Sequence, residues 1–291
     1  MKSPVLACLL SAAIGISSAN GQPAQADDPT IKALLSRLQD DTKPQKTATV
    51  RAAAYKSMGE LGDKGMSARR LLCQGMLDPN KNVAATAADS LKKIDEKMYK
   101  LAIGIFINGD VGSVKEAGKM KAAAEPLTPL VMAFAMRVSP LANKRTSVEG
   151  GDLTDPSIES SASANEKDRT ILSHRQILIA CARTLAAIAP EDDQVNAAIL
   201  NMLTSLVPSL RETALEVLTR LKSKKLALSR VLNIATNGKE RATNRTRAIQ
   251  IVPELVNENT KKATAKVLES IRFDSNPEVR DGVDRILKKL E

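Results

Sequence analysis

An apolar pattern that recurs about every 33 residues is the feature that most constrains how this chain of 291 residues folds. In each copy an apolar residue is followed by others four, eight and eleven positions later, and these offsets place all four on one face of an α-helix. Successive starts are 33, 94, 33, 34 and 35 residues apart, and the copy with a polar first residue is the weakest. Such spacing is typical of stacked helix pairs. The copies begin at Val50, Val83, Ile177, Leu210, Asn244 and Val279.

The segments between these striped helices supply a partner helix for each, across turns rich in Asn, Asp, Gly and Pro. One pair of this size cannot bury its apolar face alone, whereas stacked pairs form a continuous core. We therefore expect an all-α fold, an α-solenoid of about seven helix pairs. The expected partners are 29–39, 67–77, 194–206, 224–236 and 260–271, and the long gap adds helices at 96–108, 113–124 and 126–138, the last pairing with a helix from about Asp168.

An insertion at about 143–167 splits the fourth pair of the single array expected over residues 27–291. The segment is rich in Ser, Gly and Pro and poor in apolar residues. Loops this long are usually either functional or disordered. The composition favours disorder, and a binding loop is the alternative.

The amino terminus has the three parts of a secretory signal peptide. Lys2 supplies the positive charge, Pro4–Ile16 are a short apolar run, and Ala24-Gln25-Ala26 fit a cleavage site. The run is shorter than the ~20 residues of a transmembrane helix. We expect cleavage after Ala26, a secreted or periplasmic product, and no transmembrane segment in the mature chain.

Residues for catalysis or metal binding are scarce. His174 is the only histidine, there is no Trp, and aromatic residues make up 2% of the chain, so we expect no metal site, no cofactor and no catalytic residue. Ser90 and Lys93 fit an S-x-x-K pattern by chance. Cys73 and Cys181 lie in apolar helical segments, which favours core positions over a disulfide.

Two further short patterns have structural interpretations. The acidic pair Asp192-Asp193 precedes an expected helix and is interpreted as a cap. Asn244-Arg245-Thr246 is a glycosylation sequon, which has meaning only in a eukaryotic host.

The best copies resemble the second helix of a HEAT repeat. The resemblance rests on Val50-Arg51-Ala52-Ala53-Ala54 followed by Met58-Gly59-Glu60-Leu61-Gly62, and on Pro277-Glu278-Val279-Arg280. Tetratricopeptide repeats have a similar period, but their aromatic and glycine pattern is missing. The resemblance implies a ladder in which a turn Asp pairs with an Arg of a neighbouring repeat, although Ala84, Leu178, Gln45 and Ser205 replace some members. The matching residues are Arg51, Asp78, Arg211, Arg245, Asp274 and Arg280.

Positive charge is concentrated between Arg211 and Arg247, where ten basic residues face three acidic ones. Clustered charge attracts acidic partners, although a solvated helix face with some ladder arginines is the simpler interpretation. The candidate patch for an anionic partner consists of Arg220, Lys222, Lys224, Lys225, Arg230, Lys239, Arg241 and Arg247.

These patterns predict an exported, non-catalytic scaffold that binds an unidentified protein. The alternative is binding of an anionic polymer or membrane surface through the basic stretch at about 211–247. The export signal argues against nucleic acid as the partner. A third option follows only from the resemblance, because some HEAT-like arrays are similar to bilin lyases.

Overall fold

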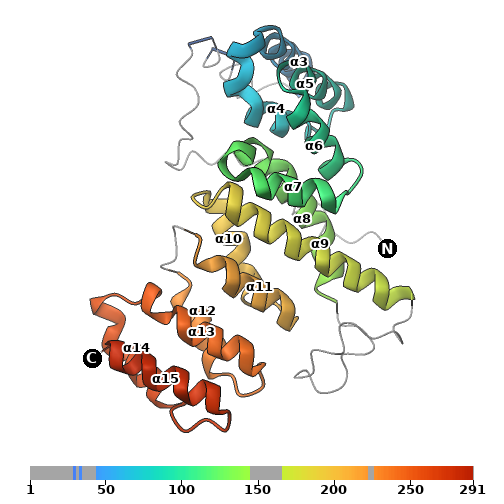
Figure 1. Ribbon diagram of the computed structural model, residues 1–291. Coiled ribbons are helices and arrows are strands. Elements are labelled where there is room, and N and C mark those ends of the chain that lie inside the picture. Colours follow the sequence, from blue (N-terminus) through green and yellow to red (C-terminus); the bar gives the residue numbers. More distant parts are fainter. Residues whose placement is uncertain (1–28, 31–32, 35–43, 145–165, 222–225, 291) are drawn as a thin grey trace.

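Every regular element in the described part of the chain is a helix (Figure 1). The computed structural model describes residues 29–30, 33–34, 44–144, 166–221 and 226–290. The predicted all-α class is therefore confirmed, whereas the predicted signal peptide and nearly all of the insertion lie outside the described residues. The helices are α3 (Pro44–Glu60), η1 (Gly62–Ala68), α4 (Arg69–Gly75), α5 (Lys81–Ile94), α6 (Glu96–Phe106), α7 (Val111–Met120), η2 (Lys121–Leu127), α8 (Thr128–Ala142), α9 (Glu166–Ile188), α10 (Asp193–Met202), α11 (Pro208–Leu218), α12 (Leu228–Thr236), α13 (Ala242–Leu255), α14 (Glu258–Glu269) and α15 (Pro277–Leu290).

Side-chain caps define where several of these helices begin. The side chain of Asn80 accepts hydrogen bonds from the backbone N–H groups of Asn82 and Val83 at the start of α5. The side chain of Asp192 does the same at the start of α10, so its interpretation as a cap is confirmed. Such caps satisfy N–H groups that have no partner inside the helix.

The second residue of each apolar stripe allows neighbouring helices to approach closely. This residue is small or β-branched in every copy, and none of the six is more than 2% exposed. Together with the larger stripe residues they belong to one continuous core that extends from Leu34 to Leu290. The six residues are Ala54, Ala87, Cys181, Ala214, Ala248 and Val283.

Consecutive helices follow one another along the molecule, from α3 and α5 at one end to α14 and α15 at the other (Figure 1). The second helices of successive pairs pack side by side, α7 on α9, α9 on α11, α11 on α13 and α13 on α15. At the other end α3 packs on α5. Between these two runs the packing passes through α6, which contacts both α5 and α7.

The segment expected as one helix at 113–124 is divided in two. The α-helix α7 ends at Met120, and the 3₁₀ helix η2 follows directly. Lys121 at this junction has a φ of 51°, a left-handed conformation that non-glycine residues rarely adopt. The expected regular helix is therefore wrong here, because one residue with a positive φ ends α7 where η2 begins.

The helix α4 departs from a simple nearest-neighbour stack. It packs against η2 and α8, which belong to a later part of the chain. Arg70 of α4 forms ion pairs with Glu125 of η2 and with Asp192, the cap of α10. All three side chains are at most 23% exposed. This partly buried cluster fixes the first pairs against the middle of the array.

The long helix α9 occupies the centre of the array, in contact with α7, α8 and α11. Among the described helices it alone has the length and apolar composition of a membrane span, although 56% of its most apolar window is buried by other helices. Arg175 within it is 2% exposed and donates hydrogen bonds to the carbonyl oxygens of Ala142 and Lys144. Packing inside the protein accounts for this composition.

The two described cysteines are free and lie in the core. Cys73 and Cys181 are fully buried, and the burial raises the pKa of each thiol to about 12. A thiol that stays protonated at neutral pH is a poor nucleophile. Both residues therefore act as small apolar side chains, as expected, and they do not form a disulfide with one another.

We expect the substitution Gly59→Ala to destabilise the protein, although alanine favours helices over glycine. A Cβ atom at position 59 of α3 would lie 2.7 Å from Cβ and 2.8 Å from Cα of Ser90 in α5. Forcing these helices apart costs about 1–3 kcal/mol, as overpacking in cores generally does. The free energy of unfolding in urea measures the change.

The matched control is Gly282→Ala in α15. A Cβ atom there meets only Cγ2 of Ile249, at an ordinary 3.6 Å. This variant should gain up to about 1 kcal/mol from helix propensity. Equal effects of the two substitutions would show that close approach of α3 and α5 does not limit position 59.

Candidate functional site

Four turns that join the two helices of a pair lie on the same side of the array (Figure 1). We call this side the turn edge and define it by residues 107–110, 203–207, 237–241 and 270–276. Arginines of the second helices and acidic residues of the next turns meet at or near this edge. These contacts decide which of the sequence-predicted residues are available to a partner.

The predicted ladder residues Arg51 and Asp78 form a bidentate ion pair. Nε of Arg51 donates to Oδ2 of Asp78 at 2.7 Å, and Nη2 donates to Oδ1 at 3.1 Å. The arginine lies in α3 and the aspartate in the turn before α5. The pair therefore joins one second helix to the turn that precedes the next.

The same relation recurs at the other end of the array. Arg245 of α13 forms a bidentate ion pair with Asp274 in the turn before α15, with its Nη1 3.1 Å from Oδ1, and Nε of Arg245 donates to the carbonyl oxygen of Ala235. Arg280 of α15 donates to the carbonyl oxygen of Asp274 at 2.7 Å. The Arg245 guanidinium holds the pKa of the Asp274 carboxyl below its usual range.

Arg211 of α11 has a partner that the repeat pattern does not identify. It pairs with Glu240, which is 5% exposed, and also donates to the carbonyl oxygen of Ser205. Glu240 lies one residue before Arg241, the residue that precedes α13, and its Oε1 accepts a hydrogen bond from Asn244 at 2.9 Å. The repeat pattern specifies an aspartate in the turn and therefore does not predict this glutamate. An acidic residue about 29 positions after the arginine is the signal that identifies both partners.

Where Leu178 replaces the ladder arginine in α9, Arg175 takes a related role one turn earlier. Its guanidinium binds the carbonyl oxygens of Ala142 and Lys144 near the end of α8. On the outer surface, Arg183 of α9 pairs with Glu216 of α11 at 2.7 Å. Charged contacts between successive pairs therefore continue through the middle of the array with different residues.

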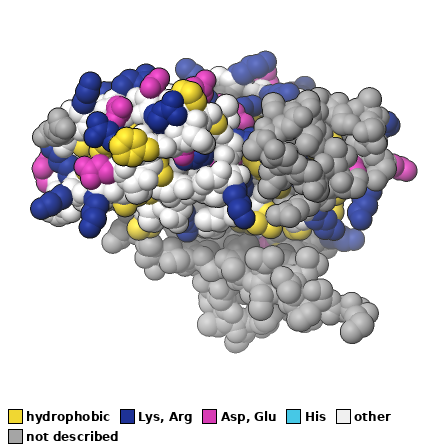
Figure 2. All heavy atoms as spheres, turned by 90° about the horizontal axis from the view of Figure 1, so that it is seen from below, with side chains coloured by type: hydrophobic (Ala, Val, Ile, Leu, Met, Phe, Trp, Pro, Cys, Tyr) yellow, Lys and Arg dark blue, Asp and Glu magenta, His cyan; other side chains and the backbone are white. Residues whose placement is uncertain are grey.

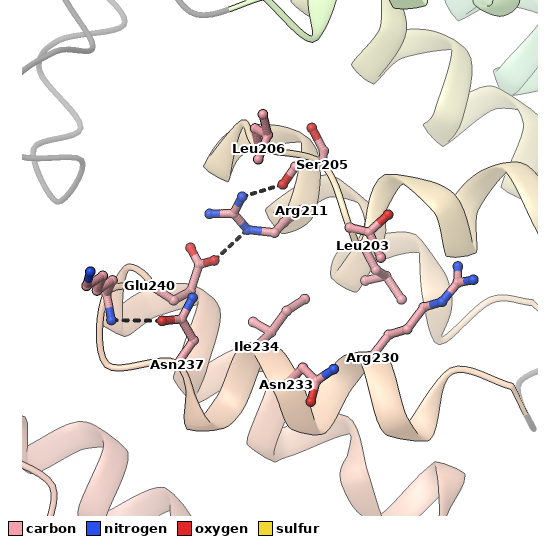
Figure 3. A pocket seen from close by; sticks show the side chains of 11 residues that line it. Leu203, Ser205, Leu206, Arg211, Arg230, Asn233, Ile234, Asn237 and Glu240 are labelled. Carbon is pink, nitrogen blue, oxygen red and sulfur yellow. Dashed lines mark hydrogen bonds and ion pairs between the residues drawn. The ribbon is translucent and has the colours of Figure 1, made fainter.

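A cleft of about 320 Å³ opens between two neighbouring turns of the turn edge (Figure 3). One wall comes from the turn 203–206 and Arg211, and the other from α12 and the turn that follows it. Leu203 and Ile234 are 2% and 5% exposed and point into the cleft from opposite walls. Its lining residues are Leu203, Thr204, Ser205, Leu206, Arg211, Arg230, Asn233, Ile234, Asn237, Lys239 and Glu240.

The spacing along α12 explains how one helix forms a whole wall. Arg230, Asn233 and Ile234 are separated by three and one residues, which places them on one face of α12, and Asn237, the residue that ends the helix, follows three positions later. They extend over about 10 Å of helix axis at 1.5 Å per residue. The cleft is therefore elongated, with Arg230 at one end and the turn containing Lys239 at the other.

The predicted basic patch is only partly available as free charge. Arg220 and Arg247 lie within ion-pair distance of Glu216 and Glu212, at 3.8 and 4.0 Å. Lys222, Lys224 and Lys225 lie outside the described residues. Viewed from below, cationic side chains lie around the molecule with acidic ones between them (Figure 2). Among the other predicted patch residues, Arg230 and Lys239 line the cleft, and Arg241 directly precedes α13.

Other sequence candidates have structural roles. Ser90 of the S-x-x-K pattern is 2% exposed and packs against Gly59. His174 lies on α9 with Nδ1 2.7 Å from the carbonyl oxygen of Thr170. Asn244 of the sequon is fully buried and donates to the carbonyl oxygen of Pro208, so a glycan cannot be attached to it in the folded protein. Within the described ranges no cluster of His, Cys, Asp or Glu has the arrangement of a metal site.

Two comparisons with known proteins identify no relative of this chain. Neither a scan against protein-family models nor a search of curated proteins finds a match to this chain.

We expect Asp274→Asn to destabilise the protein at neutral pH and to have less effect in acid. A carboxylate with a lowered pKa stabilises the folded state above the pKa of the unfolded chain, and this contribution is lost as the pH falls through the folded pKa. Loss of the charged hydrogen bonds to Arg245 should cost about 2 kcal/mol at pH 7. Urea unfolding from pH 7 to about pH 3 measures the difference from the original protein.

The control for this experiment is Asp281→Asn, which removes an exposed carboxylate from α15. Its effect should stay within a few tenths of a kcal/mol, as is usual for surface changes. A loss in Asp274→Asn that does not shrink in acid would contradict the assigned ion pair.

Proposed function

We propose that this chain is an exported, non-catalytic scaffold whose helix pairs form a HEAT-like α-solenoid that binds another protein. The observation that carries the proposal is the ordered contact between successive second helices, α7 to α15, with arginine–acid pairs from one pair to the next. Such stacks expose long surfaces relative to their core, and proteins use these surfaces for binding. The export part of the proposal rests on the amino-terminal sequence alone.

Among the described residues, the side chains that the sequence offered for chemistry have packing roles, which favours binding as the proposed role. The two described thiols are buried with raised pKa values, and the serine of the S-x-x-K pattern is a packing residue. Function on a fold of this kind must be argued from its surfaces. The turn edge offers the exposed apolar side chains Ile107, Leu206 and Phe273, which are 63%, 64% and 92% exposed.

The alternative partner, an anionic polymer or membrane surface, draws less support from the same contacts. Of the ten basic residues counted between Arg211 and Arg247, Arg211 and Arg245 are held in internal ion pairs. Two more lie within 4 Å of glutamates. These contacts reduce the free charge that a polyanion would meet.

Removal of the last helix pair tests the solenoid. We expect the chain ending at Val256 to keep its remaining helices, because in a stack each pair depends mainly on its neighbours. Its melting temperature should fall, since α13 loses α15 and Arg245 loses Asp274. Circular dichroism per residue measures the retained helices and, on heating, the melting temperature. Sedimentation velocity shows whether the shortened chain stays folded. Collapse of the helical signal throughout the shortened chain would point to a single cooperative globule instead.

Site-specific photo-crosslinking in the secreting host tests the binding function. A photoreactive residue is placed in turn at Ile107, Leu206 and Phe273 on the turn edge, and at the exposed Lys64 and Thr219 elsewhere. We expect a reproducible adduct of one mass from positions on one surface and none from the others, because a specific interface covers a limited patch. Adducts at none of the positions, or identical adducts at all, would contradict a specific scaffold.

A further inference from the structure

We propose that the cleft between the turns 203–207 and 237–241 binds an extended peptide segment in which acidic residues flank a bulky apolar one. The inference deepens the proposed scaffold function and rests on it, because it names the site and the chemistry of the partner. Three features of the cleft support it: its charge, its apolar floor and its length.

The cleft has two cations without an acidic partner among the described residues. Arg230 donates only to the neutral amide oxygen of Asn201, at 3.3 Å. For Lys239 the recorded bond is that of its backbone N–H to Asn237, which leaves the exposed ammonium group to solvent. The third cation, Arg211, is neutralised by Glu240. The remaining charge of two favours an anionic occupant.

The floor between these cations is apolar. Leu203 and Ile234 point into the cleft, and Leu206 is 64% exposed at its rim (Figure 3). An exposed leucine beside an apolar hollow gains free energy when a partner side chain covers it, at about 25 cal/mol per Å² of apolar area. A purely ionic ligand such as phosphate would leave this surface in water.

The length of the cleft matches a short stretch of extended chain. Arg230 and the turn with Lys239 are separated by about 10 Å of helix axis. An extended peptide rises about 3.3 Å per residue, so three or four residues cover this length. Side chains of an extended chain alternate between two faces, so acidic residues four positions apart and an apolar residue midway between them share the face toward the cleft. The long side chains of Arg230 and Lys239 would then meet the two acidic residues, with the apolar side chain over Ile234.

Two asparagines, one within α12 and one that ends it, can hold the peptide backbone. Asn233 is exposed in the middle of the wall. The side-chain oxygen of Asn237 accepts a hydrogen bond from the backbone N–H of Lys239, and its NH₂ group can donate to a ligand. A side-chain amide offers both donors and an acceptor, which suits the N–H and C=O groups of an extended chain. Backbone bonds of this type give affinity, while charge and apolar fit give selectivity.

A library of random eight-residue peptides displayed on phage is the probe. The chain from residue 27 onward is immobilised, and the enriched peptides are sequenced. We expect enrichment of Asp or Glu four positions apart with Leu, Ile or Phe midway between them. The best sequence is then synthesised with a fluorescent label, and its dissociation constant is measured by anisotropy.

The charge of the cleft is tested by the double reversal Arg230→Glu/Lys239→Glu. We expect it to raise the dissociation constant of the labelled peptide more than about tenfold, because the acidic residues of the peptide then face glutamates. The matched control is Lys262→Glu/Lys266→Glu, which makes the same change in net charge on two exposed residues of α14. The control should change the affinity less than about twofold, as expected for remote charges screened by salt.

The apolar contact is tested by Leu206→Ser. This side chain is 64% exposed, so the substitution should leave the melting temperature unchanged. The affinity for the labelled peptide should fall several-fold. Circular dichroism confirms the fold of each variant. If the double reversal unfolds, Arg230→Gln and Lys239→Gln replace it and should each weaken binding.

Three results would overturn the inference. These are enrichment of no peptide, enrichment of acidic residues without an apolar residue between them, and equal weakening of binding by the cleft and control reversals. Each leaves the scaffold proposal standing if photo-crosslinking still gives a position-specific adduct. Loss of that adduct at every position would instead remove the scaffold proposal itself.

Discussion

Burial of the apolar helix faces against neighbouring helices is the constraint on which the rest of the described fold depends. Among the described helices, α7, α9, α11, α13 and α15 pack one against the next in this series, so each apolar stripe is covered from more than one side. Small residues at the closest points, such as Ala87 and Gly59, set how near neighbouring helices come. The result is a single core that extends along the molecule from Leu34 to Leu290.

Helical periodicity predicted most of the described helices but not the division at Met120 or all of the packing. The stripes at Val83, Leu210 and Val279 lie within α5, α11 and α15, because a buried face requires apolar residues at fixed intervals. The positive φ at Lys121, which ends α7, leaves no such trace, since it depends on one dihedral angle. The cluster of Arg70, Glu125 and Asp192 joins residues as many as 122 positions apart, which no periodic pattern reveals.

The candidate site was predictable only in part, for a related reason. The ion pairs Arg51–Asp78 and Arg245–Asp274 involve residues that a repeat pattern singles out. Glu240 was not predicted as the partner of Arg211, because the repeat pattern specifies an aspartate and this glutamate takes its role from another position in the turn. The cleft is defined by residues from two turns and two helices, and its charge is what remains after Arg211 and Glu240 neutralise each other. A count of basic residues along the chain cannot separate paired from unpaired cations.

The ion cluster of Arg70 with Glu125 and Asp192 also has a mechanical meaning. It ties α4 to η2 and to the start of α10, so the first half of the array is braced by a link that bypasses intervening helices. From α11 onward the second helices rely on the next one along. Separating the helices therefore costs more free energy in the first half than in the second, and thermal motion between helices should be larger in the part that contains the cleft.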